Sequence, residues 1–204
     1  MIKAVIFDLN GVFLDSAPLS ARFQRVFGVP VDSFLPALKE IMDEVRKPNA
    51  PAAFSLWKPY LEKWHVKLTE PEFFDFWFSG EHLVPEFVDY AKSLREKGLK
   101  VFVLSNNFKE RTTYYRQNLS EIFKDLDGAY FSWETGFVKP DSEAYKKILN
   151  DNGLKAEECL YFDDSDRNIE AARNLGIHAK KFEGFEDTKA EIEKMTSAQT
   201  IERE

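Results

Sequence analysis

The sequence of 204 residues contains one cysteine, Cys159, and no long apolar run. A single thiol cannot form a disulfide bond within the chain, which is consistent with a reducing compartment such as the cytoplasm. The apolar run that follows Lys3 is too short for a secretory signal or a membrane-spanning helix. We therefore expect a cytoplasmic protein that has no membrane partner.

The chain also lacks an excess of positive charge. Its formal net charge is -7 and its pI is about 5.2, whereas a nucleic-acid surface needs a basic face. It contains no fixed-period repeat and no low-complexity tract. Apolar residues are abundant instead, because 44% of the chain is hydrophobic and 15% is aromatic. This composition suffices for one large domain, or for a core with a small insert, and indicates no nucleic-acid partner.

The first apolar run, Ala4-Val5-Ile6-Phe7, ends abruptly at Asp8, and Asn10 and Gly11 follow. Such a run predicts a strand over residues 2–7 that is buried on both faces of a parallel sheet. Ligands bind beyond the carboxyl ends of the strands in open α/β sheets. Gly11 permits a sharp turn close to a ligand. The sequence therefore makes Asp8 a candidate functional residue.

The next part of the chain is helical and aromatic in pattern. Apolar residues recur at helical spacing over residues 34–45, and Pro48 ends this helix. Further aromatic stripes follow up to about residue 80. The pattern predicts a small inserted α-helical cap domain over residues 16–80. We interpret its aromatic side chains mainly as packing within the insert.

After residue 80, apolar runs alternate with helical patterns. Strands are expected over residues 99–104, 128–131, 159–162 and 177–182, and helices include 109–118 and 186–195. Residues 196–204 are polar and are expected to form a frayed tail. The alternation predicts an α/β fold, with a Rossmann-like parallel sheet sandwiched by helices. Residues 1–15 and 81–204 would form this core domain.

Polar side chains follow the predicted strands, and parallel strands end at one edge of a sheet. The set comprises Asp8, Asn10, Ser105, Asn106, Lys139, Asp163, Asp164 and Asn168. Carboxylates that lie together raise one another's pKa, so positive charge must offset them. Lys139 supplies one charge and a hard cation would supply more; Mg²⁺ favours carboxylates, water and a phosphate. The set predicts a phosphate site with a metal.

The same residues suit phosphoryl transfer. A carboxylate such as Asp8 can attack phosphorus and form an aspartyl-phosphate. Ser105 and nearby backbone N–H groups are candidates for holding the phosphoryl oxygens, and Lys139 would neutralise negative charge. Asn106 is a further candidate for binding the substrate.

The motifs together resemble the haloacid dehalogenase (HAD) superfamily, in the branch with a helical cap inserted after the first strand. They are Asp8-Leu9-Asn10-Gly11-Val12, Ser105, Lys139-Pro140, and Asp163-Asp164 with Asn168, in the order of that family. The resemblance implies Asp8 as the nucleophile, and Mg²⁺ held by Asp8, the Asn10 backbone carbonyl and Asp164. Asp163 and Asn168 would lie behind these ligands. It also implies a small phosphorylated substrate, contacts from Ser105 and Lys139 to its phosphate, and a cap that closes over the site.

One position departs from the family pattern. Phosphatases of this family usually carry Asp two residues after the nucleophile, where it protonates the leaving group and then activates water, but this chain has Asn10. An amide performs no general acid–base catalysis, which commonly contributes about 10²–10⁴-fold. The candidate catalytic residues are thus Asp8, Asn10, Ser105 and Lys139, with His82 or a substrate hydroxyl as a substitute acid.

Three functions remain open from the sequence. The first is a slow phosphatase, and the second is a non-catalytic protein that binds a phosphorylated metabolite or a partner protein. The third is a different hydrolase, such as a haloacid dehalogenase. Dehalogenating relatives also lack the second Asp but work without a metal, so the paired Asp163 and Asp164 favour the phosphatase.

Overall fold

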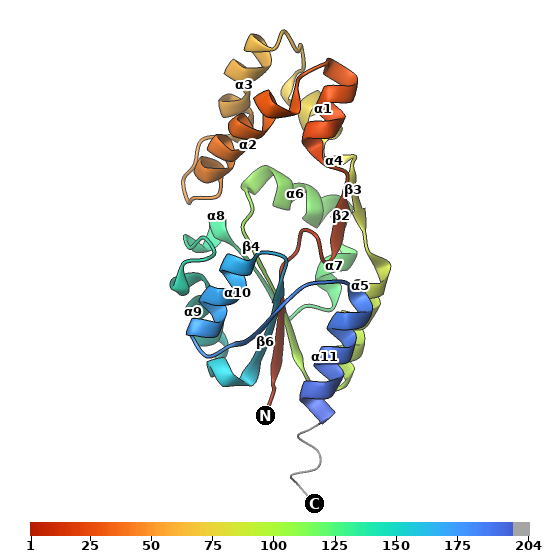
Figure 1. The fold of residues 1–204 in the computed structure, drawn as a ribbon, viewed down its shortest axis with the longest axis vertical. Coiled ribbons are helices and arrows are strands. Elements are labelled where there is room, and N and C mark those ends of the chain that lie inside the picture. The colour runs from red at the N-terminus through yellow and green to blue at the C-terminus, as the bar shows by residue number, and fades with distance from the viewer. Residues whose placement is uncertain (198–204) are drawn as a thin grey trace, which may run out of the picture.

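A parallel sheet of five strands, in the order β5-β4-β1-β6-β7, forms the centre of the computed structural model, which describes residues 1–197 (Figure 1). The strands are β1 Ala4–Phe7, β4 Lys100–Ser105, β5 Gly128–Phe131, β6 Cys159–Asp163 and β7 His178–Lys181. The predicted Rossmann-like α/β fold is confirmed. Each predicted strand is present, with ends that differ by one or two residues at most.

Strand β1 occupies the middle of the sheet. It pairs in parallel with β4 on one edge and with β6 on the other, so that Phe7 lies beside Val103 and Phe162. All four β1 side chains are buried. The continuous apolar run is therefore explained, because a central strand of a covered parallel sheet has no solvent face. Asp8 consequently leaves the sheet at its centre.

Helices cover both faces of the sheet (Figure 1). Helices α5 Pro85–Glu96 and α11 Phe185–Ser197 lie on one face, and α9 Ser142–Asn152 and α10 Asp166–Asn174 lie on the other. Successive β1 side chains point to opposite faces of the sheet. Val5 packs in the core beneath α5 and α11, and Ile6 packs in the core beneath α9 and α10. Thr196 and Ser197 belong to α11, so the prediction of a frayed tail is wrong for these two residues. The rest of the predicted tail, residues 198–204, lies outside the described part of the chain.

A helical unit stands at the carboxyl edge of the sheet (Figure 1). Its helices are α1 Leu19–Phe27, α2 Val31–Val45, α3 Ala53–Lys63 and α4 Glu70–Phe78. The chain enters and leaves this unit through an antiparallel ribbon of β2 Leu14–Ser16 and β3 Glu81–Leu83. We call residues 17–80, between these two strands, the insert. The ribbon was not predicted, because strands of three residues are too short to show an alternating pattern.

The insert has an aromatic core of its own. Phe34 stacks on Trp57 with ring centroids 5.2 Å apart, and Trp57 contacts Phe73 at 5.3 Å. The interpretation that its aromatic residues mainly pack together is confirmed. Phe108, which follows β4, also enters this core and meets Trp77 at 5.3 Å. The insert is therefore anchored on the chain that leads into α6 Lys109–Asn118.

Three short elements complete the fold. They are α7 Glu121–Lys124, α8 Ser132–Thr135 and the 3₁₀ turn η1 Ala156–Glu158. None was predicted, since elements of four residues or fewer cannot display helical periodicity. Among residues 1–197, no helix combines the length and the apolar composition that crossing a membrane requires.

Candidate functional site

A polar cavity of about 370 Å³ lies at the carboxyl ends of the central strands. Of the residues that the sequence proposed for the site, all line this cavity except Asp163, which is fully buried, and His82, the proposed substitute acid. The residues come from the segments after β1, β4 and β6 and from the segment before α9. The topology thus gathers side chains that are more than 150 residues apart in the chain, since residues 8 and 164 meet here.

Three carboxylates form the centre of the site. Oxygen atoms of Asp8, Asp163 and Asp164 all lie within 4.8 Å of one another. Asp8 follows β1 and Asp163 ends β6, and these strands pair in register, so the two side chains are neighbours by construction of the sheet. A compact set of oxygen donors suits a hard divalent cation such as Mg²⁺.

Lys139 opposes two of these carboxylates. Its Nζ lies 3.0 Å from Asp8 Oδ1 and 2.6 Å from Asp163 Oδ2, and its side chain is almost completely buried. Burial alone would lower the pKa of Lys139, but the charges of Asp8 and Asp163 raise it above its ordinary value. The lysine therefore stays protonated and links the loop before α9 to the strand ends.

Asp163 is committed to contacts within the protein. It accepts hydrogen bonds from the Ser165 backbone N–H at 2.8 Å, from Asn168 Nδ2 at 3.0 and 3.1 Å, and from the Tyr161 hydroxyl. Burial favours its neutral form, but Lys139 holds the pKa of Asp163 below its ordinary value. Because so many donors surround it, the Asp163 carboxylate holds Lys139 in position and does not face the cavity.

The other two carboxylates face the cavity with raised pKa values. Burial raises the pKa of Asp8 and outweighs the opposing effect of Lys139, and the charge of Asp163 raises it further. Burial and the charge of Asp163 also raise the pKa of Asp164. Gly11 passes close by, with φ +87°, and a Cβ there would lie 3.7 Å from Asp164 Oδ2. A bound cation would therefore stabilise the ionised forms of Asp8 and Asp164, as expected at a cation site.

The Asn10 side chain is held on both of its polar atoms. Its Nδ2 donates to the Tyr115 hydroxyl at 2.8 Å, and its Oδ1 accepts from Asn107 Nδ2 at 3.1 Å. Tyr115 and Asn107 are themselves buried. Neither residue was predicted from the sequence to belong to the site, although Asn107 directly follows two proposed site residues, Ser105 and Asn106. The amide is therefore fixed in place without offering an acidic proton.

Asn106 also uses both of its polar atoms within the protein. Its Oδ1 accepts from the Lys139 backbone N–H at 2.7 Å and its Nδ2 donates to the Lys139 carbonyl at 2.8 Å. This pair ties the end of β4 to the loop that carries Lys139. Substrate binding by Asn106 stays a prediction, as does the contact from Ser105, which ends β4 and lines the cavity.

The polar cavity is also lined by three arginines that were not predicted from the sequence: Arg46, Arg111 and Arg167. Arg111, in α6, pairs with Glu81 through Nε at 2.7 Å and Nη2 at 2.6 Å. Its place near the start of the helix after β4 was a usable signal. Arg46 directly follows α2 in the insert, and only the tertiary fold brings it here.

His82, the proposed substitute acid, does not line the cavity. It lies on β3, paired with Asp15 of β2, and its side chain is exposed to solvent. The strand alternation explains this position, because Glu81, the preceding residue, points inward and is buried. His82 is therefore not positioned to protonate a leaving group at Asp8.

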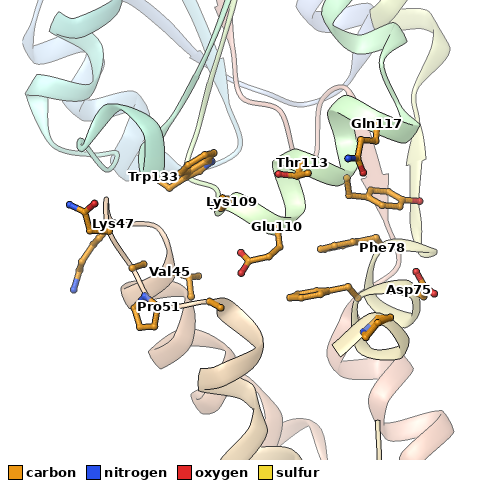
Figure 2. A pocket seen from close by; sticks show the side chains of 16 residues that line it. Val45, Lys47, Pro51, Asp75, Phe78, Lys109, Glu110, Thr113, Gln117 and Trp133 are labelled. Carbon is orange, nitrogen blue, oxygen red and sulfur yellow. The ribbon is translucent and has the colours of Figure 1, made fainter. Parts of the chain in front are cut away.

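A second and larger cavity, of about 660 Å³, lies between the insert and helices α6 and α8 (Figure 2). Aromatic side chains line it, among them Phe74, Phe78, Tyr114 and Trp133. Figure 2 shows Glu110 extending from α6 into the space between Val45 and Phe78. Glu110 Oε1 accepts a hydrogen bond from the Ala53 N–H at 2.8 Å. None of the proposed site residues lines this aromatic cavity.

Sequence comparison gives one family. The model of the haloacid dehalogenase-like hydrolases matches residues 2–176. Bifunctional epoxide hydrolase 2 of Sus scrofa is 25% identical over an alignment of 221 positions, gaps included, which covers 98% of this chain and 40% of that protein. Enolase-phosphatase E1 of Aquifex aeolicus is 26% identical over an alignment of 227 positions, gaps included, which covers 99% of this chain and 100% of that protein. The chain thus spans about two fifths of the porcine relative and the whole bacterial one.

Solved structures share the fold. A HAD family enzyme from Bacteroides thetaiotaomicron, in complex with magnesium and inorganic phosphate, superposes with a TM-score of 0.74 at 22% identity. The match covers 89% of this chain and 94% of that chain. At this identity the likeness concerns the arrangement of the strands and helices.

Proposed function

Since the chain belongs to the haloacid dehalogenase-like hydrolases, we propose that it is a Mg²⁺-dependent phosphatase that acts on a small phosphorylated metabolite. The observation that carries this proposal is the group of Asp8, Asp163 and Asp164, with oxygens within 4.8 Å of one another, beside the buried Lys139. The relative named enolase-phosphatase, which this chain matches along its full length, supports the same activity.

The donors present fit a magnesium ion. Asp8, Asp164 and the Asn10 backbone carbonyl are oxygen ligands and would hold it, while Asp163 stays engaged with Lys139. When bound, Mg²⁺ supplies positive charge that favours the ionised form of Asp8 and offsets the charge of the phosphate. The raised pKa values of Asp8 and Asp164 are consistent with such a requirement.

The reaction follows from Asp8 and its neighbours. One oxygen of Asp8 attacks phosphorus, and the bond from phosphorus to the leaving oxygen breaks with its electron pair on that oxygen. Ser105 would donate a hydrogen bond to the phosphoryl group, and Lys139 would neutralise its charge. Water then attacks phosphorus of the aspartyl-phosphate, which releases inorganic phosphate and restores the Asp8 carboxylate.

Asn10 sets the speed of these steps. It neither donates a proton to the leaving oxygen nor accepts one from water, so both protons must be exchanged with solvent. Leaving groups that are stable as anions, such as aryl oxides, need no proton on departure. We therefore expect aryl phosphates to be hydrolysed faster than alkyl phosphates.

One observation favours a second function, the binding of a phosphorylated metabolite without turnover. The Asn10 amide is held by Tyr115 and Asn107, so nothing in its contacts supplies the missing acid. The third function, dehalogenation, has less support, because the three clustered carboxylates suit a metal site. Halide release from small haloacids would reveal it directly.

The metal site is tested by thermal unfolding with and without Mg²⁺. A ligand at 100 times its Kd stabilises a protein by about 2.7 kcal/mol, so we expect a clear rise in the Tm. Asp164→Ala should abolish the rise, whereas Asp166→Ala, which removes a nearby exposed carboxylate, should retain it. Equal rises in both variants would contradict the proposed metal site.

The nucleophile is tested by intact mass after incubation with an aryl phosphate or with beryllium fluoride. A phosphoryl-like adduct that maps to Asp8, together with release of the aryl alcohol, supports the phosphatase. Substrate-dependent stabilisation without an adduct or product would favour the binding protein instead.

A further inference from the structure

A recess of about 230 Å³ is lined by residues of the insert, of the β2–β3 ribbon and of α6. The recess adjoins the polar cavity, because Arg46 and Arg111 line both spaces. The remaining walls of the recess are largely apolar and include Leu38, Met42 and Trp77. Its volume equals about eight water molecules at liquid density. A small organic group, but not a large one, fits there.

Two buried polar atoms in residues that line this recess have no hydrogen-bond partner within residues 1–197. One is Arg46 Nε, a donor, and the other is Glu81 Oε2, an acceptor. Glu81 is only 5% exposed, and Arg111 binds its other oxygen, Oε1. An unsatisfied buried polar group costs about 1–3 kcal/mol. Two residues that line the recess therefore carry one unsatisfied donor and one unsatisfied acceptor.

The charges around the recess indicate which group meets Arg46. Lys139 is opposed by Asp8 and Asp163, and Arg111 by Glu81, but Arg46 forms no ion pair in the described part of the chain. Burial and the nearby charge of Arg111 lower the pKa of Arg46. An anionic acceptor on the ligand would relieve both effects and would form a charge-assisted hydrogen bond with Nε.

We propose that the recess binds the alcohol half of the substrate, and that this half carries a carboxylate for Arg46 and an N–H or O–H donor for Glu81. The inference rests on the proposed phosphatase function, with the phosphoryl group at Asp8. The substrate class is then a small phosphorylated amino acid or hydroxy acid. Its short aliphatic part would lie against Leu38 and Met42.

The experiment compares four phosphomonoesters, with kcat/KM as the readout. O-Phosphoserine carries both the carboxylate and the donor, phosphoethanolamine lacks the carboxylate, phosphoglycolate lacks the donor, and 4-nitrophenyl phosphate lacks both. Arg46→Met should lower kcat/KM about 10- to 100-fold for the two carboxylates, the value of one charge-assisted hydrogen bond. The other two esters should change less than threefold. Arg46→Lys should restore part of the loss.

The matched control is Arg25→Met, which removes an exposed arginine of α1 and should leave all four values unchanged. An equal loss with all four esters in Arg46→Met would overturn the inference, because Arg46 would then act on the transferred phosphoryl group. No loss with any ester would overturn it as well.

Calorimetric binding to Asp8→Asn, with Mg²⁺ present, separates the subsite from the reaction. Tighter binding of O-phosphoserine than of phosphoethanolamine, lost on adding Arg46→Met, supports the subsite even if the natural chain hydrolyses neither ester. In that case the phosphatase proposal alone fails. If the natural chain hydrolyses all four esters and the variant binds them equally tightly, the subsite proposal alone fails. If the esters are neither bound nor hydrolysed, both proposals are contradicted.

Discussion

The polar cavity and the aromatic cavity both lie where the insert meets the α/β core, and they differ in kind. The smaller, of about 370 Å³, is lined by charged side chains from the strand ends. The larger, of about 660 Å³, is lined by aromatic side chains of facing helices. Its central carboxylate, Glu110, already serves a structural contact with the Ala53 N–H. Cavity size therefore does not identify the reactive site here, whereas convergence of the strand ends does.

The physical reason is the way each cavity is built. Parallel strands in register fix the backbone at their ends, so Asp8 and Asp163 have little freedom to separate. Catalysis needs such fixed geometry. The aromatic cavity instead arises between the insert and α6, which meet there through side chains such as Phe78 and Tyr114, with ring centroids 5.0 Å apart. Substitutions in the polar cavity should consequently change activity and stability far more than substitutions in the aromatic cavity.

The largest difference should come from Asp8→Asn. Loss of the nucleophile should lower aryl phosphate turnover by on the order of 10³-fold or more, as for other catalytic nucleophiles. Thr113→Val, in the aromatic cavity, should stay within twofold of the natural protein. Steady-state kinetics at saturating Mg²⁺ gives both values. Comparable losses in the two variants would mean that the aromatic cavity takes part in the reaction.

Lys139→Met should cause the largest loss of stability. It leaves Asp8 and Asp163 without their shared cation, and breaking a buried ion pair costs about 3–5 kcal/mol. Lys109→Met, at the exposed rim of the aromatic cavity, should cost less than about 0.5 kcal/mol. Urea unfolding gives both free energies.

The pH dependence of the Lys139→Met effect has a defined sign. Lys139 depresses the pKa of Asp163, so this contribution exists above the pKa of an unfolded Asp and is lost as the pH falls through the lower folded value. The stability gap between the natural protein and Lys139→Met should therefore shrink on acidification. A gap that widens toward low pH would contradict the pairing.

Asn10→Asp should act in the opposite direction and raise turnover, by about 10²-fold, the low end for a general acid–base group. The Asp side chain can keep the bond from Asn107, and the Tyr115 hydroxyl can donate to it instead of accepting. Alkyl phosphates should gain more than aryl phosphates, because only their leaving group needs the proton. Asn118→Asp, on the exposed surface of α6, is the control. An unchanged rate would show that proton transfer does not limit turnover.

The smallest effect should follow Glu110→Ala. It removes the acceptor of the Ala53 N–H at the start of α3. Loss of such a helix cap costs about 1 kcal/mol, and Glu110→Gln, which keeps an acceptor oxygen, should cost less. Turnover should be unchanged in both variants. A tenfold change in kcat/KM for either variant would show that the aromatic cavity contributes to the reaction.

The sheet could be predicted from the sequence because strands such as β1, β4 and β6 are continuous apolar runs. Each of these strands ends in a polar residue or is followed by one. This pattern predicts that Asp8, Ser105 and Asp163 lie close together. Their meeting needs only the rule that parallel strands end at one edge. The fold and the polar centre were therefore accessible from local pattern.

The remainder depends on tertiary packing. Arg46 reaches the cavity only because the insert folds back over the sheet edge, and no spacing in the sequence encodes that approach. Tyr115 binds Asn10 across 105 residues of chain. His82 was misjudged because a strand of three residues gives too little alternation to assign its faces. These positions require the three-dimensional arrangement of the insert and α6.

The β2–β3 ribbon has a consequence for how such chains can change. The two crossings between insert and core lie side by side, and the Ala17 N–H even reaches the Gly80 carbonyl at 3.3 Å. A segment whose ends touch can be lengthened, exchanged or excised without rethreading any strand, and loop closure costs only about 0.6 kcal/mol for each doubling of length. The insert can therefore be replaced by another segment, by evolution or by design, while the connectivity of the sheet stays the same.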